Sequence, residues 1–433
     1  MGKAARRKQK GPSVKRPPPQ ADRQWRGRLA IAGVALVVLV CLGVWNFWRG
    51  GADPPQTVRS LPDPDLAGMT APVARAIRTA RQEALARPDS AEAVGRFGQV
   101  CHAHWLQDAA AACYEIAREL DPAEFRWVYL LAGVEELRGA DGERVDELFR
   151  AAIRLAPDYP AAYVRRADAL LRVGRWSEAR DSYAAAVQRD PELVLAHRGL
   201  GQAALLLRDG PAAVESLERA ARLAPDDRIA QVALAPAYAL MDRNEEAAEA
   251  AEKAETLSAE ARLPDRIFFE IQDLAVDPES LRARVARGLQ AGNHEETIEA
   301  LTLLEESEGA PVRRQMGLVR KQRANQLAFG GDFDNALAEF ERAASLIPTD
   351  PEIEHNWGTV LLRQGKLEEA GRHFEKAIKL NPRSPESLYN MGVALEGLGR
   401  TDEAIERFKA AAAINPRHVA ARRLAELGVA SRP

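Results

Sequence analysis

Cysteine and histidine are the side chains whose spacing could support metal or nucleophilic chemistry, and this chain has three cysteines and seven histidines. Cys101, His102 and His104 lie close together, but a separation of two residues does not place both imidazoles on one side of a helix. No two cysteines have the C-x-x-C spacing of metal ribbons, redox motifs or c-type haem attachment. The histidines are scattered: His102, His104, His197, His294, His355, His373 and His418. We therefore expect no metal site.

Cys101 and Cys113 fall on two helices that the sequence predicts to be adjacent. They are either buried small hydrophobic residues or partners in a disulfide formed in an oxidising compartment. The chain contains neither the G-x-x-x-x-G-K-[ST] phosphate loop nor the G-x-S-x-G nucleophile elbow. The sequence therefore predicts a protein that is not an enzyme and has no cofactor.

The elements that carry these residues repeat with a period of 34 residues. Prolines recur at this spacing in two series, Pro157, Pro191 and Pro225, and Pro348, Pro382 and Pro416. Within residues 385–418, small residues at Gly392 and Ala404 let two helices approach, and Phe408 fills the space toward the next unit. Apolar spacings of three and four residues indicate that both halves of a unit are helical. A single hairpin cannot bury its own faces, so the units must stack.

This pattern of small, aromatic, small and proline positions resembles that of the tetratricopeptide-repeat (TPR) family. The resemblance implies an all-α solenoid of about eight to nine helical hairpins in a right-handed superhelix, which holds protein or peptide partners on its concave face. We expect eight units, at 91–124, 126–159, 160–193, 194–227, 228–261, 317–350, 351–384 and 385–418. A degenerate ninth fits 278–311. Block one is then 91–261 and block two 317–418, with capping helices within 71–90 and 419–433.

Two features depart from the repeat. Pro236 falls inside the first helix of its unit, where it removes a backbone hydrogen bond and should kink the helix. Residues 262–277 break the period, within an insert and degenerate repeat spanning 262–316. Ile267, Phe268, Phe269 and Ile271 are too apolar for a free linker. This segment either packs between the two blocks or occupies the binding groove.

The resemblance places the groove on the first helix of each unit, and the two blocks differ there. The candidates in block one are apolar: Trp127, Leu130, Val134 and Leu137, followed by Val164, Leu171, Leu195, Leu205, Ile229 and Val232. Such a stripe could seat an amphipathic helix or an apolar peptide. Alternatively, the superhelix closes on the stripe or the 262–277 segment covers it.

The candidates in block two are polar: Lys321, Asn325, Asn356 and Asn390. They resemble part of the carboxylate clamp with which some TPR cochaperones grip a peptide C-terminus. The third unit departs from that clamp, because Glu386 and Asn390 stand where it has Lys and Arg. A simpler alternative is that the asparagines hydrogen-bond the backbone of an extended peptide.

An anchor precedes the repeats. Residues 29–48 form an uncharged apolar run, which as a helix would span about 30 Å, the thickness of a bilayer core. Trp45, Phe47 and Trp48 cluster at its end, as aromatic residues do at a membrane interface. The sequence thus predicts one transmembrane helix, followed by a proline-rich stalk at 49–70.

Charge gives the orientation of this anchor. Residues 1–28 contain ten Lys or Arg and one Asp, whereas the whole chain has a net charge of −3, so the body is acidic. The positive-inside rule places the N-terminal tail in the cytoplasm and the body outside, which in a bacterium is the periplasm. An acidic body is also a poor partner for nucleic acid.

These features predict a scaffold tethered to the cytoplasmic membrane that recruits protein or peptide partners in envelope assembly, secretion or a membrane complex. The alternative is a body that faces the cytoplasm and serves a membrane enzyme as accessory subunit, for example in polysaccharide or lipopolysaccharide synthesis.

Overall fold

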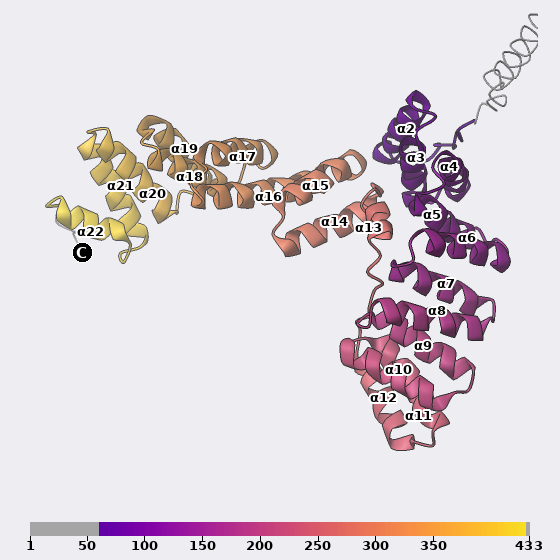
Figure 1. The fold of residues 1–433 in the computed structure, drawn as a ribbon. Coiled ribbons are helices and arrows are strands. Elements are labelled where there is room, and N and C mark those ends of the chain that lie inside the picture. Colours follow the sequence, from indigo (N-terminus) through magenta and orange to yellow (C-terminus); the bar gives the residue numbers. More distant parts are fainter. Residues whose placement is uncertain (1–59, 430–433) are drawn as a thin grey trace, which may run out of the picture. The chain divides into compact units, whose positions relative to one another are not determined.

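The computed structural model describes residues 60–429, which form 21 helices and no strand. From α2 to α12 and from α14 to α22, helices that follow one another in the chain pack side by side (Figure 1). The expected all-α solenoid is thus confirmed for these residues. The predicted membrane span at 29–48 lies outside the described residues, and within 60–429 no helix is long and apolar enough to cross a bilayer.

Each 34-residue unit expected from the sequence contains one pair of helices. In block one these are α3 (Ala91–Ala103) with α4 (Gln107–Leu120), α5 (Phe125–Leu137) with α6 (Gly142–Leu155), α7 (Pro160–Arg172) with α8 (Trp176–Arg189), α9 (Val194–Leu206) with α10 (Gly210–Leu223), and α11 (Arg228–Leu240) with α12 (Asn244–Thr256). Later pairs are α14 (Pro278–Ala291) with α15 (His294–Glu308), α16 (Ala310–Phe329) with α17 (Phe333–Leu346), α18 (Pro351–Arg363) with α19 (Leu367–Leu380), and α20 (Pro385–Gly397) with α21 (Thr401–Ile414). Three helices are unpaired: α2 (Ala71–Ala86), α13 (Arg266–Gln272) and α22 (Val419–Glu426).

Residues 385–418 show why each unit folds this way. The Ser384 hydroxyl accepts a hydrogen bond from the backbone N–H of Ser387 and so caps α20. The turn between the helices needs a left-handed residue, and Gly399 supplies it with φ 76°. Phe408 is fully buried, and a Cβ on Gly392 would lie 2.4 Å from its ring. Only glycine allows the two helices this approach.

Two details differ from expectation. The described end of the predicted stalk belongs to the folded body, because Leu61 is buried in the core of the first repeats and Arg81 Nε donates to the Pro62 carbonyl at 2.9 Å. Helix α16 is 20 residues long and starts before its 34-residue unit. Pro236 lies inside α11, as expected, and the helix continues through it to Leu240.

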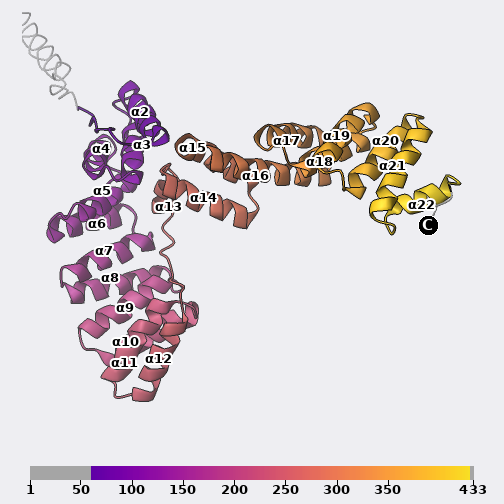
Figure 2. The same ribbon diagram turned by 180° about the vertical axis from the view of Figure 1, so that it is seen from behind.

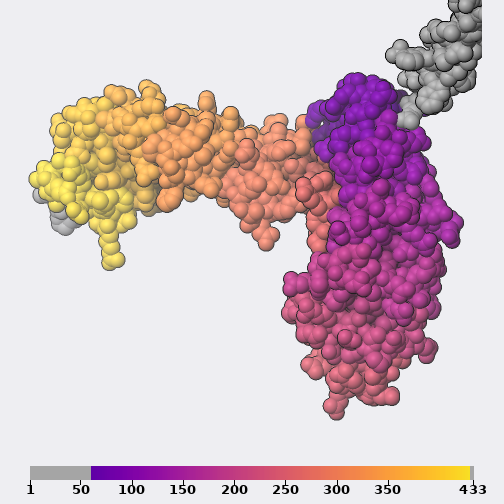
Figure 3. Space-filling view, viewed as in Figure 1, coloured from indigo at the N-terminus to yellow at the C-terminus, as the bar shows by residue number. Residues whose placement is uncertain are grey.

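The segment between α12 and α13 turns back along block one (Figures 1 and 2). The Ala259 carbonyl accepts a hydrogen bond from the Arg228 N–H, and Leu263 packs on the core around α7 to α9. Asp265 then reaches α5 and α7. In the space-filling view, this salmon-coloured segment lies directly against the purple surface of the first repeats (Figure 3). The chain therefore returns to its own early repeats before block two begins.

Candidate peptide-binding site

The first helices of the early repeats hold the carboxylate of Asp265. Tyr129 Oη and Arg165 Nε donate to Oδ2 at 2.5 and 2.7 Å, and Tyr159 Oη donates to Oδ1 at 2.7 Å. Tyr129 lies on α5, Tyr159 precedes α7, and Arg165 lies on α7. Asp265 is 1% exposed and also caps α13, accepting a hydrogen bond from the Phe268 N–H. Three side chains from two repeats therefore bind one acidic side chain of a distant segment.

The environment keeps the donors in the forms that bind an anion. Burial and the nearby Asp265 carboxylate both raise the pKa of Tyr129 and of Tyr159, so both phenols stay protonated. Burial lowers the pKa of Arg165, but its interactions with Tyr129 and Asp265 outweigh this and raise the pKa overall. The cluster thus presents two hydroxyl donors and one cation to a carboxylate.

Phe268 lies one helical turn after Asp265, and its ring packs against the same repeats. The Arg165 guanidinium carbon lies 3.4 Å from the centre of the Phe268 ring. His102 and Tyr129 meet that ring edge to face, with centroids 5.6 and 5.9 Å away. A Cβ on Gly133 would come 2.9 Å from Phe268 Cζ, so glycine leaves the room that the ring uses. We call His102, Tyr129, Gly133, Tyr159 and Arg165 the α13 seat.

The surroundings of His102 explain its protonation state. Its Nδ1 lies 3.3 Å from Tyr114 Oη, and burial, assisted by the charge of Arg165, lowers the pKa of His102 to about 4. Cys101 and Cys113 are buried free thiols, which confirms the interpretation as small hydrophobic residues. Burial raises the pKa of Cys101 to about 12, so this thiol is not a nucleophile at neutral pH. Across residues 60–429, no group of three or more His, Cys, Asp and Glu is placed to hold a metal ion.

Four of the ten positions in the apolar stripe predicted in block one are buried in the core. Trp127 is 1% exposed and Leu130 and Val134 are 0% exposed, so the prediction of accessible groove residues is wrong for these three. They pack in one hydrophobic core with both isoleucines of α13. Leu137 is 49% exposed. Of the further positions, Val164 is buried, Leu171, Leu195, Leu205 and Ile229 are half-buried, and Val232 is exposed.

The polar positions predicted in block two already have partners within the chain. Asn356 Nδ2 donates to Asn325 Oδ1 at 3.0 Å, and Asn390 Nδ2 lies 3.4 Å from the hydroxyl of Thr359. Lys321 Nζ contacts Asp350 at 2.9 Å and Glu352 at 2.8 Å.

Burial by itself would lower the pKa of Lys321. The hydrogen bonds and charges of Glu352 and Asp350 have the larger effect, so the pKa of Lys321 is raised above its usual value. A clamp for a peptide carboxylate needs its cation uncompensated. Lys321 instead already faces two carboxylates, so the resemblance to the clamp does not extend to its charge.

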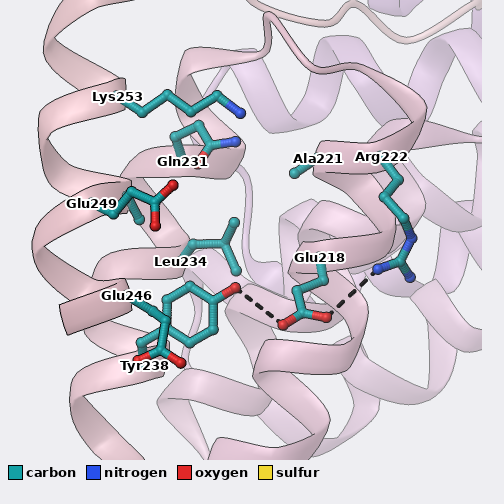
Figure 4. A pocket seen from close by; sticks show the side chains of 10 residues that line it. Glu218, Ala221, Arg222, Gln231, Leu234, Tyr238, Glu246, Glu249 and Lys253 are labelled. Carbon is teal, nitrogen blue, oxygen red and sulfur yellow. Dashed lines mark hydrogen bonds and ion pairs between the residues drawn. The ribbon is translucent and has the colours of Figure 1, made fainter. Parts of the chain in front are cut away.

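A cavity of about 280 Å³ lies between α10, α11 and α12 (Figure 4). Its lining mixes acidic side chains with Arg222 and Lys253. The Glu218 carboxylate accepts a hydrogen bond from Tyr238 Oη at 3.0 Å and pairs with Arg222 at 3.5 Å. Because charged groups of both signs line it, the cavity does not indicate one class of ligand.

Sequence reasoning missed most of the α13 seat. It singled out Phe268 as too apolar for a linker but assigned no role to Tyr129, Tyr159, Arg165 or Asp265. The available signal was the order of residues in the insert, a proline and an aspartate followed by an apolar run, which is typical of a capped helix start. Nothing in the 34-residue pattern indicates which repeats such a helix would contact.

Comparison with known proteins agrees with the fold. A family profile described as tetratricopeptide repeat matches residues 108–160, 164–227 and 355–419. Among solved structures, MamA (residues 41 to the end) from Desulfovibrio magneticus RS-1 is 20% identical, with a TM-score of 0.37, covering 39% of this chain and 94% of that one. The first TPR of Spaghetti (RPAP3) bound to HSP90 peptide SRMEEVD is 22% identical, with a TM-score of 0.26, covering 26% of this chain and 91% of that one.

The Arabidopsis OM64 TPR domain is also 22% identical, with a TM-score of 0.26, covering 27% of this chain and 98% of that one. Because all three TM-scores are below 0.5, these structural similarities carry no argument about fold or function. No curated protein matches the sequence significantly. On the family profile, the chain carries tetratricopeptide repeats in residues 108–160, 164–227 and 355–419.

Proposed function

We propose that this chain is a membrane-tethered scaffold that holds protein or peptide partners on the first helices of its repeats. The observation that carries the proposal is the α13 seat. There the repeats bind a segment more than 90 residues away in sequence through a buried carboxylate and an aromatic ring. A face that recognises one segment by directed contacts has the features that protein recognition needs.

The tether is proposed from the sequence. Residues 29–48 have the length and composition of a transmembrane helix, and the basic tail before them favours a cytoplasmic N-terminus. The body would then work in the periplasm, in envelope assembly, secretion or a membrane complex.

Photocrosslinking in cells tests the binding role. Crosslinkers at Val232 on α11 and Asn325 on α16 probe exposed positions of first helices. Asp181 on α8 and Glu341 on α17 are equally exposed positions of second helices and serve as controls. The proposal expects discrete crosslinked partners from the first pair and few from the second. Equal crosslinking at all four positions, or none, would contradict it.

Protease protection tests the tether and its orientation. With the full chain in a bacterial host, protease added to spheroplasts should degrade the body and leave the short N-terminal tail protected. Recovery of the chain in the soluble fraction would exclude the membrane anchor. A membrane-bound body that resists added protease would place it in the cytoplasm and favour the accessory-subunit alternative.

A further inference from the structure

The α13 seat has the properties of a ligand site rather than of one more repeat contact. Its anion-binding groups, Tyr129, Tyr159 and Arg165, all belong to the repeats. The group that they bind, Asp265, belongs to a segment that does not follow the 34-residue pattern. An 8-residue connection without helix, 257–264, precedes Asp265. The segment is therefore presented to the repeats as a tethered peptide would be.

The α13 seat contacts two features of the segment that it binds, and these features have a fixed spacing in the sequence. One is a carboxylate at the N-cap of a short helix, and the other is an aromatic ring three residues later. Arg165 contacts both groups, because its Nε donates to the carboxylate while its guanidinium carbon lies over the Phe268 ring. Gly133 removes the side chain that would otherwise fill the place of the ring. Together these contacts select an Asp-x-x-Phe segment in helical form.

An empty seat would be unfavourable, and this determines what can replace α13. Without a carboxylate, the two phenol hydroxyls and the partly buried Arg165, 25% exposed, would lose their shared acceptor. Release of α13 into water replaces the carboxylate acceptor with weaker hydrogen bonds to water and uncovers the buried Ile267 and Ile271. Exchange for a segment of the same chemistry restores the contacts of the donors. The geometry therefore favours exchange of ligands over simple opening.

We propose that the α13 seat accepts, in place of Asp265–Gln272, a helical Asp-x-x-Phe segment of a partner protein, with α13 as the internal competitor. This inference rests on the proposed scaffold function and names the chemistry of its partner. The tether 257–264 gives α13 a high effective concentration at the seat, which a partner must overcome by affinity or by abundance. Binding of the partner then frees α13 and the connection that leads to block two.

A labelled peptide with the sequence of residues 263–276 tests the exchange by fluorescence anisotropy with the full chain in detergent. Asp265→Asn with Phe268→Ala disables the internal competitor and leaves every seat residue unchanged. This double variant should bind the peptide at least about tenfold more tightly than the wild-type chain, because the tethered competitor is removed. Adding Arg165→Met should abolish that binding. A peptide carrying the same Asn and Ala changes is the matched control and should not bind.

A second version of the experiment tests the proposal if the double variant misfolds. A specific protease site inserted into the exposed stretch after Ser258 allows the wild-type seat and α13 to be kept while the tether is cut. After cleavage, excess peptide should displace α13, seen as faster amide hydrogen exchange in residues 266–272. The inference is overturned if the cut chain neither binds the peptide nor releases α13, or if binding is independent of Arg165.

One further outcome would also overturn it. If the cut or double-variant chain forms dimers in which the seat is filled by α13 of a second copy, the natural occupant is this chain and not a partner. Failure here is distinguishable from failure of the scaffold function. The peptide assay contains no cellular protein, and the crosslinks at Val232 and Asn325 do not depend on the seat.

Discussion

Asp265 and Arg165 meet at 2.7 Å across a sequence separation of 100 residues, and the carboxylate of this pair is 2% exposed. Such a pair joins the insert to the early repeats with little screening by solvent. Removing one charge of a buried pair leaves the other without a partner, which costs more than the loss of a surface ion pair. The contact therefore makes the position of α13 sensitive to single substitutions.

Asp265→Asn should loosen α13 without unfolding the repeats. The amide keeps the size of the side chain but leaves Arg165 without its counter-charge, at a cost of about 1–3 kcal/mol. Limited proteolysis should then cut the 257–264 connection faster. Asp273→Asn is the matched control, because Asp273 ends the same helix and pairs with Arg287 in an exposed bridge worth about 0–1 kcal/mol. Equal protease sensitivity of both variants would contradict the role of Asp265.

Gly133→Ala tests the space beside Phe268. Alanine normally stabilises a helix interior by about 0.5–1 kcal/mol relative to glycine. At position 133 the added Cβ would lie 2.9 Å from Phe268 Cζ, inside a ring environment that is already filled, so we expect a net loss of about 1–3 kcal/mol from overpacking. Gly371→Ala on α19 is the control, because its nearest contact is an ordinary 3.8 Å. Urea denaturation should therefore show opposite signs for the two variants.

The helix pairs could be predicted from the sequence and the α13 seat could not, for a physical reason. The period of 34 depends on contacts within one hairpin and with the next, such as Gly392 against Phe408, so residue spacing records it. Asp265 is recognised by groups from two repeats that lie 100 and more residues earlier. No local pattern encodes such a contact.

The prediction that Trp127, Leu130 and Val134 are accessible was wrong for a related reason. A family resemblance places Trp127, Leu130 and Val134 on the first helix, but it does not say what packs over that helix in this chain. Their burial depends on close neighbours, including α13, that a repeat pattern does not contain. The repeat register does place Asn325 and Asn356 in contact, because these two residues occupy equivalent positions of neighbouring repeats.

Leu130→Asp and Leu137→Asp separate core from surface on one helix. Leu130 is 0% exposed, so a carboxylate there is desolvated without a partner, and we expect a loss of about 4 kcal/mol or more that unfolds the first repeats. Leu137 lies two turns further along α5 and is 49% exposed, so its substitution should cost less than about 0.5 kcal/mol. Circular dichroism melting curves test both. A Leu130→Asp variant that melts like wild type would refute its place in the core.

His102 predicts a dependence of stability on pH. A histidine titrates near pH 6.5 in the unfolded chain, whereas burial lowers the pKa of His102 to about 4 in the folded chain. Between these values the unfolded state binds more protons, so the free energy of unfolding falls as the pH is lowered from 6.5 toward 4. The contribution of this one group reaches about 1.4 kcal/mol per pH unit at its steepest.

His102→Gln removes the ionisable group and retains a side chain that can hydrogen-bond Tyr114. The variant should therefore lose less stability than wild type between pH 7 and pH 4.5 in urea titrations monitored by near-ultraviolet circular dichroism. If the wild-type protein and the variant lose the same stability over this pH range, His102 is not buried as a neutral imidazole.

The polar face of block two gives the last prediction. Replacing Asn325, Asn356 and Asn390 together with alanine should weaken capture of an extended peptide by about 0.5–1.5 kcal/mol for each hydrogen bond lost. The fold should persist, because Asn325 is exposed and the other two are only half-buried. Asn335→Ala on the second helix α17 is the control for the loss of an exposed amide. If the triple variant retains all partners that co-purify with wild type, these amides make only contacts within the chain, the 3.0 Å bond between Asn356 and Asn325 and the contact of Asn390 with Thr359.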